Sequence, residues 1–284
     1  MVKKYGSSTG FYSLLLAPIS IKGLIFISSI YAADTTPVTD NKQLTDCKNY
    51  HTDFSKGTEG WVEIRGAKNN WQITQDGLKL ILVPPSAYTQ LIDKETPDNL
   101  KYNDAEGDGP TFNATTLMHY GRFSATLKSA KTGGAVTAII LIADDKDEID
   151  FELLGKGQEE AEDVQSNYFW GQRIVYGENG ASHKIEGGLI SEVFHTYTVD
   201  WNFDRIQWLV DGNVVRTKTR NETKGEYPSS PARVQIGLWD GSGASGTAQW
   251  AHGPISWNQT KDAVSATIKE IKIECDPEYN NVIH

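Results

Sequence analysis

Three acidic residues alternate along the stretch EIDFE near the middle of the chain. Read as a β-strand, this stretch directs Glu148, Asp150 and Glu152 to one face, because successive side chains of a strand point to opposite faces. Ile149 and Phe151 then point to the other face, as a buried core requires. Like charges about 7 Å apart on one face repel one another and add nothing to stability. The pattern therefore indicates chemistry.

Paired carboxyl groups can cleave a glycosidic bond when one is a nucleophile and the other an acid, and in the retaining mechanism they lie about 5–5.5 Å apart. The Cα atoms of Glu148 and Glu152 lie about 13 Å apart along a strand, so side chains that lean inward can approach the retaining distance. The charge of Asp150 between them raises a neighbouring carboxyl pKa, so one Glu would hold a proton while the other stays ionised. Spacing alone does not assign these two roles.

Two other interpretations of the acidic stretch stay open. It could be a solvated strand face, which is common in proteins. It could also be a calcium loop, since DDKDEID is rich in carboxylates. That stretch lacks the glycine that an EF-hand loop needs at its sixth position, and Ile149 stands where an oxygen ligand would. We therefore expect neither a metal ion nor a cofactor.

Two further stretches carry polar and aromatic side chains at alternate positions. In ARVQIGLWD, one face holds Arg233, Gln235 and Trp239, and in VQSNYFW one face holds Gln165 and Asn167. An indole stacks on the apolar face of a sugar ring, while amide and guanidinium groups hydrogen-bond to its hydroxyls. Both stretches therefore predict a sugar-binding surface.

The segment DGSGASGTAQW, which follows Trp239, is rich in glycine. We expect a loop whose backbone approaches a ligand closely before Trp250. A single Trp is more often a core residue than a sugar platform. With eight Trp and twelve Tyr in the chain, however, some aromatic side chains are expected to line a groove.

The chain as a whole predicts an all-β fold, a two-sheet jelly-roll sandwich. Short runs rich in β-branched and aromatic residues recur, and no long stripe of period 3.6 is present. Asp211 and Gly212 separate RIQWLV from NVVRTKT, which is a strong hairpin signal. Many strands at this spacing indicate two packed sheets. Residues 47–284 are expected to form this domain.

The N-terminal region resembles a targeting segment. Lys3 and Lys4 precede a long apolar stretch that ends in small residues at Ala32, which predicts a secretory signal peptide over residues 1–32. A membrane anchor is the alternative, although a proline and a lysine interrupt the apolar stretch. Residues 33–46 are polar and are expected to form a flexible lead-in. The C-terminal residues have no apolar tail, so no lipid anchor is predicted.

Two cysteines and three sequons agree with secretion. Cys47 and Cys275 could form a disulfide that joins the two ends of the domain, and two free thiols are the alternative. A loop this long would stabilise the fold by about 4–5 kcal/mol in the chain-entropy model. The candidate N-glycosylation sites are Asn113, Asn221 and Asn258.

The charge of the chain limits the class of partner. The sequence has 37 acidic and 27 basic residues and a formal net charge of −10. Nucleic-acid binding needs a basic surface, so a nucleic-acid partner is not expected. A neutral polymer fits better. We expect a monomer in the extracellular space or cell wall whose partner is a polysaccharide.

The motifs between Tyr120 and Trp257 resemble a known family. DEIDFE is similar to the E-x-D-x-E signature of glycoside hydrolase family sixteen, in the form without an inserted bulge residue. With YGRFSATLKSAKTGGAVTAIILIAD, HTYTVDWNFDRIQWLVDGNVVRT and YPSSPARVQIGLWDGSG, it resembles the fungal Crh-type chitin transglycosylases. This resemblance implies a jelly roll with a concave substrate cleft. It also implies a retaining reaction on cell-wall polysaccharide, with chitin as donor and β-glucan or chitin as acceptor.

The resemblance also implies roles for individual residues. Glu148 would be the nucleophile, Glu152 the acid/base and Asp150 the assisting carboxylate. Leu153 and Leu154 stand where family members often carry a second Trp, so the cleft floor is expected to differ there. The positions at which the family holds sugar correspond to Arg233, Trp239 and Thr247.

Two alternative functions stay open. One is a secreted endo-β-1,3(4)-glucanase of the same family, from which the residues alone do not separate a transglycosylase. The other is a carbohydrate-binding sandwich without catalytic activity. The three aligned acids favour an enzyme, because a binding module has no need of them.

Overall fold

The computed structural model describes residues 44–66, 69–156, 163–171, 173 and 177–283. The predicted signal peptide and most of the predicted lead-in lie outside these residues. Strand β1 (Thr45–Lys48) includes the last two residues of the segment that we expected to be a flexible lead-in. The folded domain therefore begins slightly earlier than predicted.

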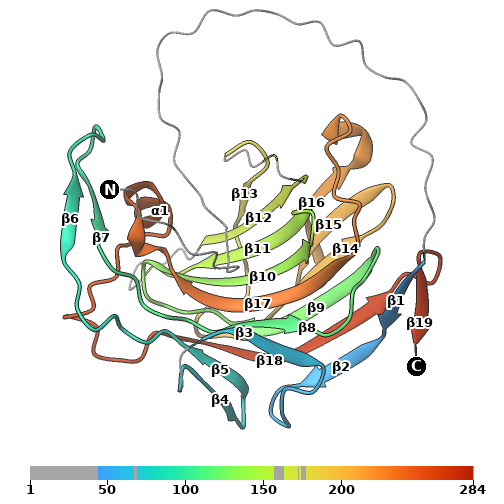
Figure 1. Ribbon diagram of the computed structural model, residues 1–284, viewed down its shortest axis with the longest axis horizontal. Coiled ribbons are helices and arrows are strands. Elements are labelled where there is room, and N and C mark those ends of the chain that lie inside the picture. Colours follow the sequence, from blue (N-terminus) through green and yellow to red (C-terminus); the bar gives the residue numbers. More distant parts are fainter. Residues whose placement is uncertain (1–43, 67–68, 157–162, 172, 174–176, 284) are drawn as a thin grey trace, which may run out of the picture.

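A curved sheet of seven strands forms one layer of the molecule (Figure 1). Its strand order is β13-β12-β11-β10-β17-β8-β3, and all its neighbouring strands run antiparallel. The strands are β3 (Trp61–Arg65), β8 (Thr111–Ala114), β10 (Ala135–Ala143), β11 (Glu148–Leu154), β12 (Asp163–Phe169), β13 (Ala181–His183) and β17 (Ala232–Asp240).

A second sheet of eight strands forms the other layer. Its order is β16-β15-β14-β9-β18-β5-β4, and β2 pairs with β18. The strands are β2 (Tyr50–Asp53), β4 (Trp71–Thr74), β5 (Gly77–Ile81), β9 (Gly121–Lys128), β14 (His195–Trp201), β15 (Arg205–Val210), β16 (Asn213–Thr219) and β18 (Ser265–Cys275).

Smaller elements complete the described fold. The parallel pair β1 and β19 (Asn280–Ile283) brings the first and last strands together, and β6 (Gln90–Asp93) pairs with β7 (Leu100–Asn103). The helical turns are η1 (Arg220–Thr223), η2 (Gly241–Gly243) and α1 (Ser245–Trp250). The β6–β7 hairpin and α1 stand together at one end of the seven-stranded sheet (Figure 1).

One hydrophobic core fills the space between the two sheets. From β11 it receives Ile149, Phe151 and Leu153, each at most 1% exposed, as the alternation predicted. The eight-stranded sheet contributes Trp201 and Trp208. Side chains that point into the core alternate along these strands with side chains that point away from it, because each strand has one face in the core. The prediction of an all-β sandwich is confirmed.

Two local predictions have different outcomes. The Asp211–Gly212 turn joins β15 to β16 with φ angles of 49° and 80°, as a two-residue hairpin of type I′ requires, so that prediction is confirmed. The glycine-rich segment after β17 was expected to be a loop, and this is wrong. It forms η2 and α1. Asp240 caps η2, because its side chain accepts from the backbone N–H of Ser242.

The predicted disulfide is present. Cys47 on β1 is bonded to Cys275 at the end of β18, with a Cα–Cα distance of 6.1 Å. The bond closes a loop that spans 228 positions of the sequence. It therefore attaches the first strand to the longest strand of the eight-stranded sheet.

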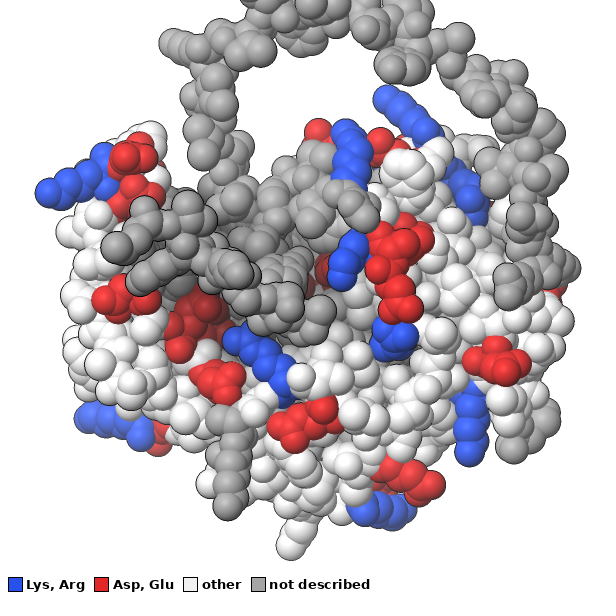
Figure 2. Space-filling view, in the orientation of Figure 1, with Lys and Arg blue, Asp and Glu red and all other residues white. Residues whose placement is uncertain are grey.

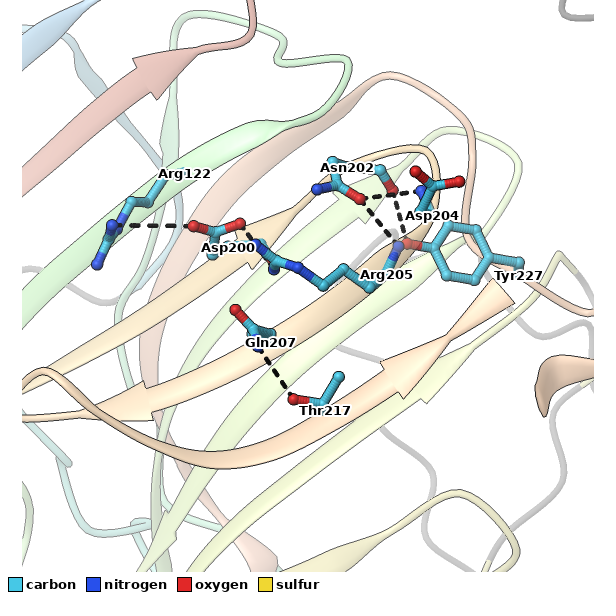
Figure 3. Close-up of polar contacts among 8 residues, drawn as sticks. All are labelled: Arg122, Asp200, Asn202, Asp204, Arg205, Gln207, Thr217 and Tyr227. Atoms are coloured by element: carbon cyan, nitrogen blue, oxygen red, sulfur yellow. Dashed lines mark hydrogen bonds and ion pairs between the residues drawn. The ribbon is translucent and has the colours of Figure 1, made fainter. Parts of the chain in front are cut away.

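The back face, defined as the face of the eight-stranded sheet that points away from the core, carries a row of polar side chains (Figure 3). Asp200 interacts with Arg205 at 3.0 Å and with Arg122 at 3.8 Å. Next to them, the side-chain amide of Gln207 donates to Thr217 at 3.1 Å. These side chains pair with one another through ion pairs and hydrogen bonds, so the row stabilises the contact between neighbouring strands.

Acidic and basic side chains are interspersed on the face shown in Figure 2, and the described residues form no continuous basic stripe there. Among the residues that the structure describes, no helix reaches the length and apolar character needed to cross a membrane.

Candidate active site

Strand β11 carries the three acidic side chains on the concave face, which we define as the face of the seven-stranded sheet turned away from the core. Glu148, Asp150 and Glu152 are 9%, 1% and 4% exposed, respectively. They alternate with core residues, so the predicted alignment on one face is confirmed. Burial of an ionisable group disfavours its charged form.

Burial dominates the electrostatics of the first two acids. It raises the pKa of Glu148 well above its usual range, and the negative charges of Asp150 and Glu152 raise it further. Burial also raises the pKa of Asp150, to about 7. The Glu148 carboxyl and the backbone N–H of Asn167 lie close enough to Asp150 to lower its pKa, although neither Asp150 oxygen meets strict hydrogen-bond geometry within the described part of the chain. The titrations of the two carboxyls are therefore coupled.

A cation from the other sheet lies behind this pair. The Arg216 guanidinium on β16 stacks 4.6 Å from the Trp208 ring and donates to the backbone oxygen of Ser166 at 2.9 Å. Trp208 in turn donates its indole N–H to the backbone oxygen of Asp150 at 3.0 Å. The charge of Arg216 lowers the pKa of Asp150, but less than burial raises it. These residues link the two sheets directly beneath the acids.

A row of side chains crosses the strands at the level of Asp150. Asp150 pairs with Asn167 on β12 and with Ile140 on β10, and Ile140 pairs with Gln235 on β17. Directly opposite residues of antiparallel strands share a face, so this row lies on the concave face. The structure thus brings the predicted sugar-binding residues Asn167 and Gln235 onto the same face as the acids.

Arg233 lies beside the acids in the neighbouring row. It pairs in register with Ile142, which itself pairs with Glu148. Its guanidinium forms a 2.8 Å ion pair with Asp144, whose side chain is 82% exposed. An ion pair with so exposed a partner is weak, so the guanidinium is available to a ligand.

Two tryptophans form an apolar platform at the Glu152 end of the concave face. The Trp239 and Trp250 rings stack with centroids 5.9 Å apart and planes inclined by 21°. They pack on Val136 and Leu154 in a cluster separate from the main core. Leu154, one of the two leucines at which we expected the cleft floor to differ, thus packs against these two rings.

Trp250 also reaches across the sheet. Its indole N–H donates to the side-chain oxygen of Gln165 at 2.9 Å, and Gln165 pairs in register with Glu152. Thr247, one helical turn earlier on α1, is 8% exposed. The predicted residues Gln165, Trp250 and Thr247 are therefore brought to the end of the face at which Glu152 lies.

Sequence reasoning did not find Asp147. One of its oxygens accepts from the backbone N–H of Gly171, and the other accepts from those of Ser229 and Ser230, at 2.7, 2.7 and 3.1 Å. Asp147 is 4% exposed and immediately precedes Glu148. It fixes two loops at the start of β11. Its place before the acidic motif is the one sequence signal that points to it.

The candidate N-glycosylation sites differ in their surroundings. Asn221 on η1 and Asn258 are exposed. Asn113 is partly buried on β8, and its side-chain oxygen accepts from Gln235 at 2.6 Å. Glycosylation of all three stays a prediction.

The comparisons with known proteins agree with this geometry. The model of the family described as Glycosyl hydrolases family 16 matches residues 65–262. Crh-like protein 2 of Aspergillus fumigatus is 41% identical over 172 residues, which cover 56% of this chain and 38% of that protein. Crh-like protein UTR2 of Candida albicans is 39% identical over 159 residues, which cover 53% of this chain and 33% of that protein. The chain thus spans well under half the length of these curated relatives.

Solved structures show the same fold. A structure described as Crh5 transglycosylase in complex with NAG matches with a TM-score of 0.67 and 28% identity, over 84% of this chain and 88% of that one. A Bacillus licheniformis β-glucanase matches with a TM-score of 0.60 at 22% identity, over 80% of this chain and 97% of that one, which shows the fold alone. The matched family region contains all three acids of β11. The chain belongs to glycosyl hydrolase family 16 and resembles its fungal Crh-type members.

Proposed function

We propose that this chain is a retaining glycosidase and transglycosylase that cleaves chitin and transfers it to β-glucan or chitin acceptors. The observation that carries the proposal is the placement of Glu148, Asp150 and Glu152 on one face of β11, where burial raises the pKa of each of the first two and their titrations are coupled. The similarity to a solved Crh5 transglycosylase, determined with NAG, supports the choice of donor.

In the first step, Glu152 donates its proton to the leaving glycosidic oxygen while a Glu148 oxygen attacks the anomeric carbon. The bond between carbon and leaving oxygen breaks, and an ester to Glu148 forms. Glu148 must be ionised to attack, so the proton of the coupled pair resides on Asp150 in the reactive state. A protonated Asp150 then donates to the remaining oxygen of Glu148, which keeps that carboxyl oriented.

In the second step, Glu152 accepts a proton from an acceptor hydroxyl, whose oxygen attacks the anomeric carbon and releases Glu148. A sugar acceptor gives a cross-link between polymers, and water gives hydrolysis. The platform of Trp239 and Trp250 lies at the Glu152 end of the face. A sugar stacked there would be held near the base and would compete with water through orientation and occupancy.

The site of action that we propose is the cell wall or extracellular space. The Cys47–Cys275 disulfide supports it, because disulfides form and persist in oxidising compartments. We further propose that the protein acts there as a monomer.

The experiment incubates the full chain with chitin oligomers and a fluorescent β-glucan oligomer, and separates labelled products by size. We expect label in larger products, and we expect Glu148→Gln to abolish this transfer while oligomer binding persists. Shortened β-glucan without labelled transfer product would instead support the glucanase alternative. If the wild type and the variant both bind the oligomers and neither turns them over, the chain is a carbohydrate-binding module.

A further inference from the structure

Asn113 lies on the concave face, in the same cross-strand row as Asp150. On β8 it pairs with Gln235 on one side, and with Val62 on β3 on the other. Because Gln235 follows Ile140 and Asp150 in this row, Asn113 stands three strands from the catalytic strand. Three interstrand spacings of about 4.8 Å place it about 14 Å from Asp150.

A bound polysaccharide would extend along this row. Glu148 and Glu152 lie along the direction of β11, and the bond to be cleaved must pass between them. A polysaccharide that passes between two side chains of the same strand runs across the neighbouring strands. Towards β3, it crosses β17, β8 and β3 in that order (Figure 1). In this row these strands carry Gln235, Asn113 and Val62, respectively.

The hydrogen bond between the two amides fixes which atoms they offer to a ligand. The Gln235 amide nitrogen donates to the Asn113 side-chain oxygen at 2.6 Å. The Gln235 oxygen and the Asn113 nitrogen are left to bind other groups. This pair therefore presents one acceptor next to two N–H donors. Val62 adds an apolar side chain, 52% exposed, directly opposite Asn113.

We propose that Asn113, Gln235 and Val62 bind the acetamido group of an N-acetylhexosamine unit, and this rests on the proposed function. The acetamido carbonyl accepts from Asn113, its N–H donates to Gln235, and its methyl group packs on Val62. A glucose unit has a hydroxyl at the corresponding carbon and lacks the methyl group. The subsite therefore distinguishes chitin from glucan at a position distant from the reacting bond.

This role conflicts with glycosylation of Asn113. The sequence Asn113-Ala114-Thr115 is a sequon, and a glycan would be attached to the same nitrogen that donates to the substrate. It would also occupy the concave face beside Gln235. The active enzyme therefore carries an unmodified Asn113.

Three variants of the full chain, secreted from a yeast host, test the proposal. Asn113→Asp removes the donor, Val62→Thr replaces the apolar contact with a hydroxyl, and Thr115→Ala removes the sequon but keeps Asn113. Each of these is also combined with Glu148→Gln, so that binding is measured by calorimetry without turnover. The probes are N-acetylglucosamine oligomers and β-1,3-glucan oligomers of equal length.

We expect Asn113→Asp to weaken binding of the N-acetylglucosamine oligomers about tenfold, because a donor is replaced by an acceptor that faces the acetamido carbonyl. Val62→Thr, at an exposed position that tolerates substitution, is expected to weaken it about threefold. Glucan binding should change less than twofold in both variants. Thr115→Ala should leave binding unchanged, and the mass of the peptide that contains Asn113 should change only by the difference between Thr and Ala, with no glycan lost.

Unchanged N-acetylglucosamine binding in Asn113→Asp and Val62→Thr overturns the subsite. Equal losses for both sugars also overturn it, since they indicate recognition of hydroxyls alone. A glycan on Asn113 in the active wild-type protein contradicts it directly. Failure of this proposal can be distinguished from failure of the proposed function. Absence of transfer by the wild type would reject the transglycosylase, whereas the binding measurements test the subsite whether or not transfer occurs.

Discussion

Trp250 donates its indole N–H to the side-chain oxygen of Gln165 at 2.9 Å, which joins helix α1 to strand β12 across the concave face. Trp250 lies in the segment after β17, and Gln165 lies 85 residues earlier in the chain. Since Gln165 pairs with Glu152, this bond fixes the Trp platform relative to the proposed acid/base.

Replacement of Trp250 by Phe tests this connection. Phe keeps an aromatic ring on Val136 and Leu154 but removes the N–H, so a contribution of about 1 kcal/mol is lost. We expect KM for a sugar acceptor to rise about fivefold and the ratio of transfer to hydrolysis to fall. Product analysis at several acceptor concentrations measures both. An unchanged ratio would show that Trp250 does not orient the acceptor.

Trp170 provides a matched control for Trp250. It is 42% exposed and lies just after the end of β12, so it shares the aromatic chemistry but not the bond to Gln165. Trp170→Phe is expected to leave the ratio of transfer to hydrolysis unchanged. An equal effect in both variants would point to a general loss of aromatic surface.

Replacement of Asp150 by Asn separates stability from activity. Burial raises the pKa of Asp150 from 3.8 to about 7, so the folded protein holds a proton that the unfolded chain releases near pH 4. The wild type therefore loses stability as the pH rises from about 4 to 7, whereas Asn carries no charge to bury. Asp150→Asn should match the wild type near pH 4 and exceed its unfolding free energy above pH 7, by up to about 4 kcal/mol.

Denaturant unfolding at pH 4, 6 and 8 measures this difference, and turnover is measured in parallel. We expect turnover of Asp150→Asn to fall at least tenfold, because Asn cannot exchange a proton with Glu148. A variant that is less stable than the wild type at pH 8 would contradict the buried, coupled pair.

The sequence predicted β11 and its three acids because alternation is a local property. Glu148, Asp150 and Glu152 share a face in any strand, and hydrophobic neighbours decide which face is buried. Strands β9 to β12 and β14 to β18 were also visible as β-branched and aromatic runs, whereas β13 and β19 were not. Most earlier strands, such as β4 and β8, have four residues each, too few to produce a clear period.

Long-range pairing explains what the sequence could not show. Asn113 is recognisable as a sequon, but its contact with Gln235 joins residues 122 positions apart and depends on β8 lying beside β17. Arg216 and Trp208 belong to the other sheet and reach the acids only through the packing of the two layers. No local pattern encodes such neighbours.

Asp147 is predicted to stabilise the loops at the start of β11. Its carboxylate accepts from three backbone N–H groups, and Asp147→Ala would leave these donors without their acceptor. We expect a loss of about 3 kcal/mol in unfolding free energy. Asp144→Asn is the control, because that exposed side chain forms only a surface ion pair and should change stability by less than about 1 kcal/mol. Equal losses in the two variants would reject the structural role of Asp147.

The Cys47–Cys275 disulfide is predicted to stabilise the folded chain mainly by restricting the unfolded one. It closes a loop that spans 228 positions, and the chain-entropy model assigns such a loop about 5 kcal/mol, from which native-state strain subtracts. We expect the double variant Cys47→Ser/Cys275→Ser to lose about 2–5 kcal/mol in denaturant unfolding. The acids of β11 are not in contact with this bond, so turnover per folded molecule should be unchanged. Loss of turnover in a variant that remains folded would show that the clamp also positions the catalytic sheet.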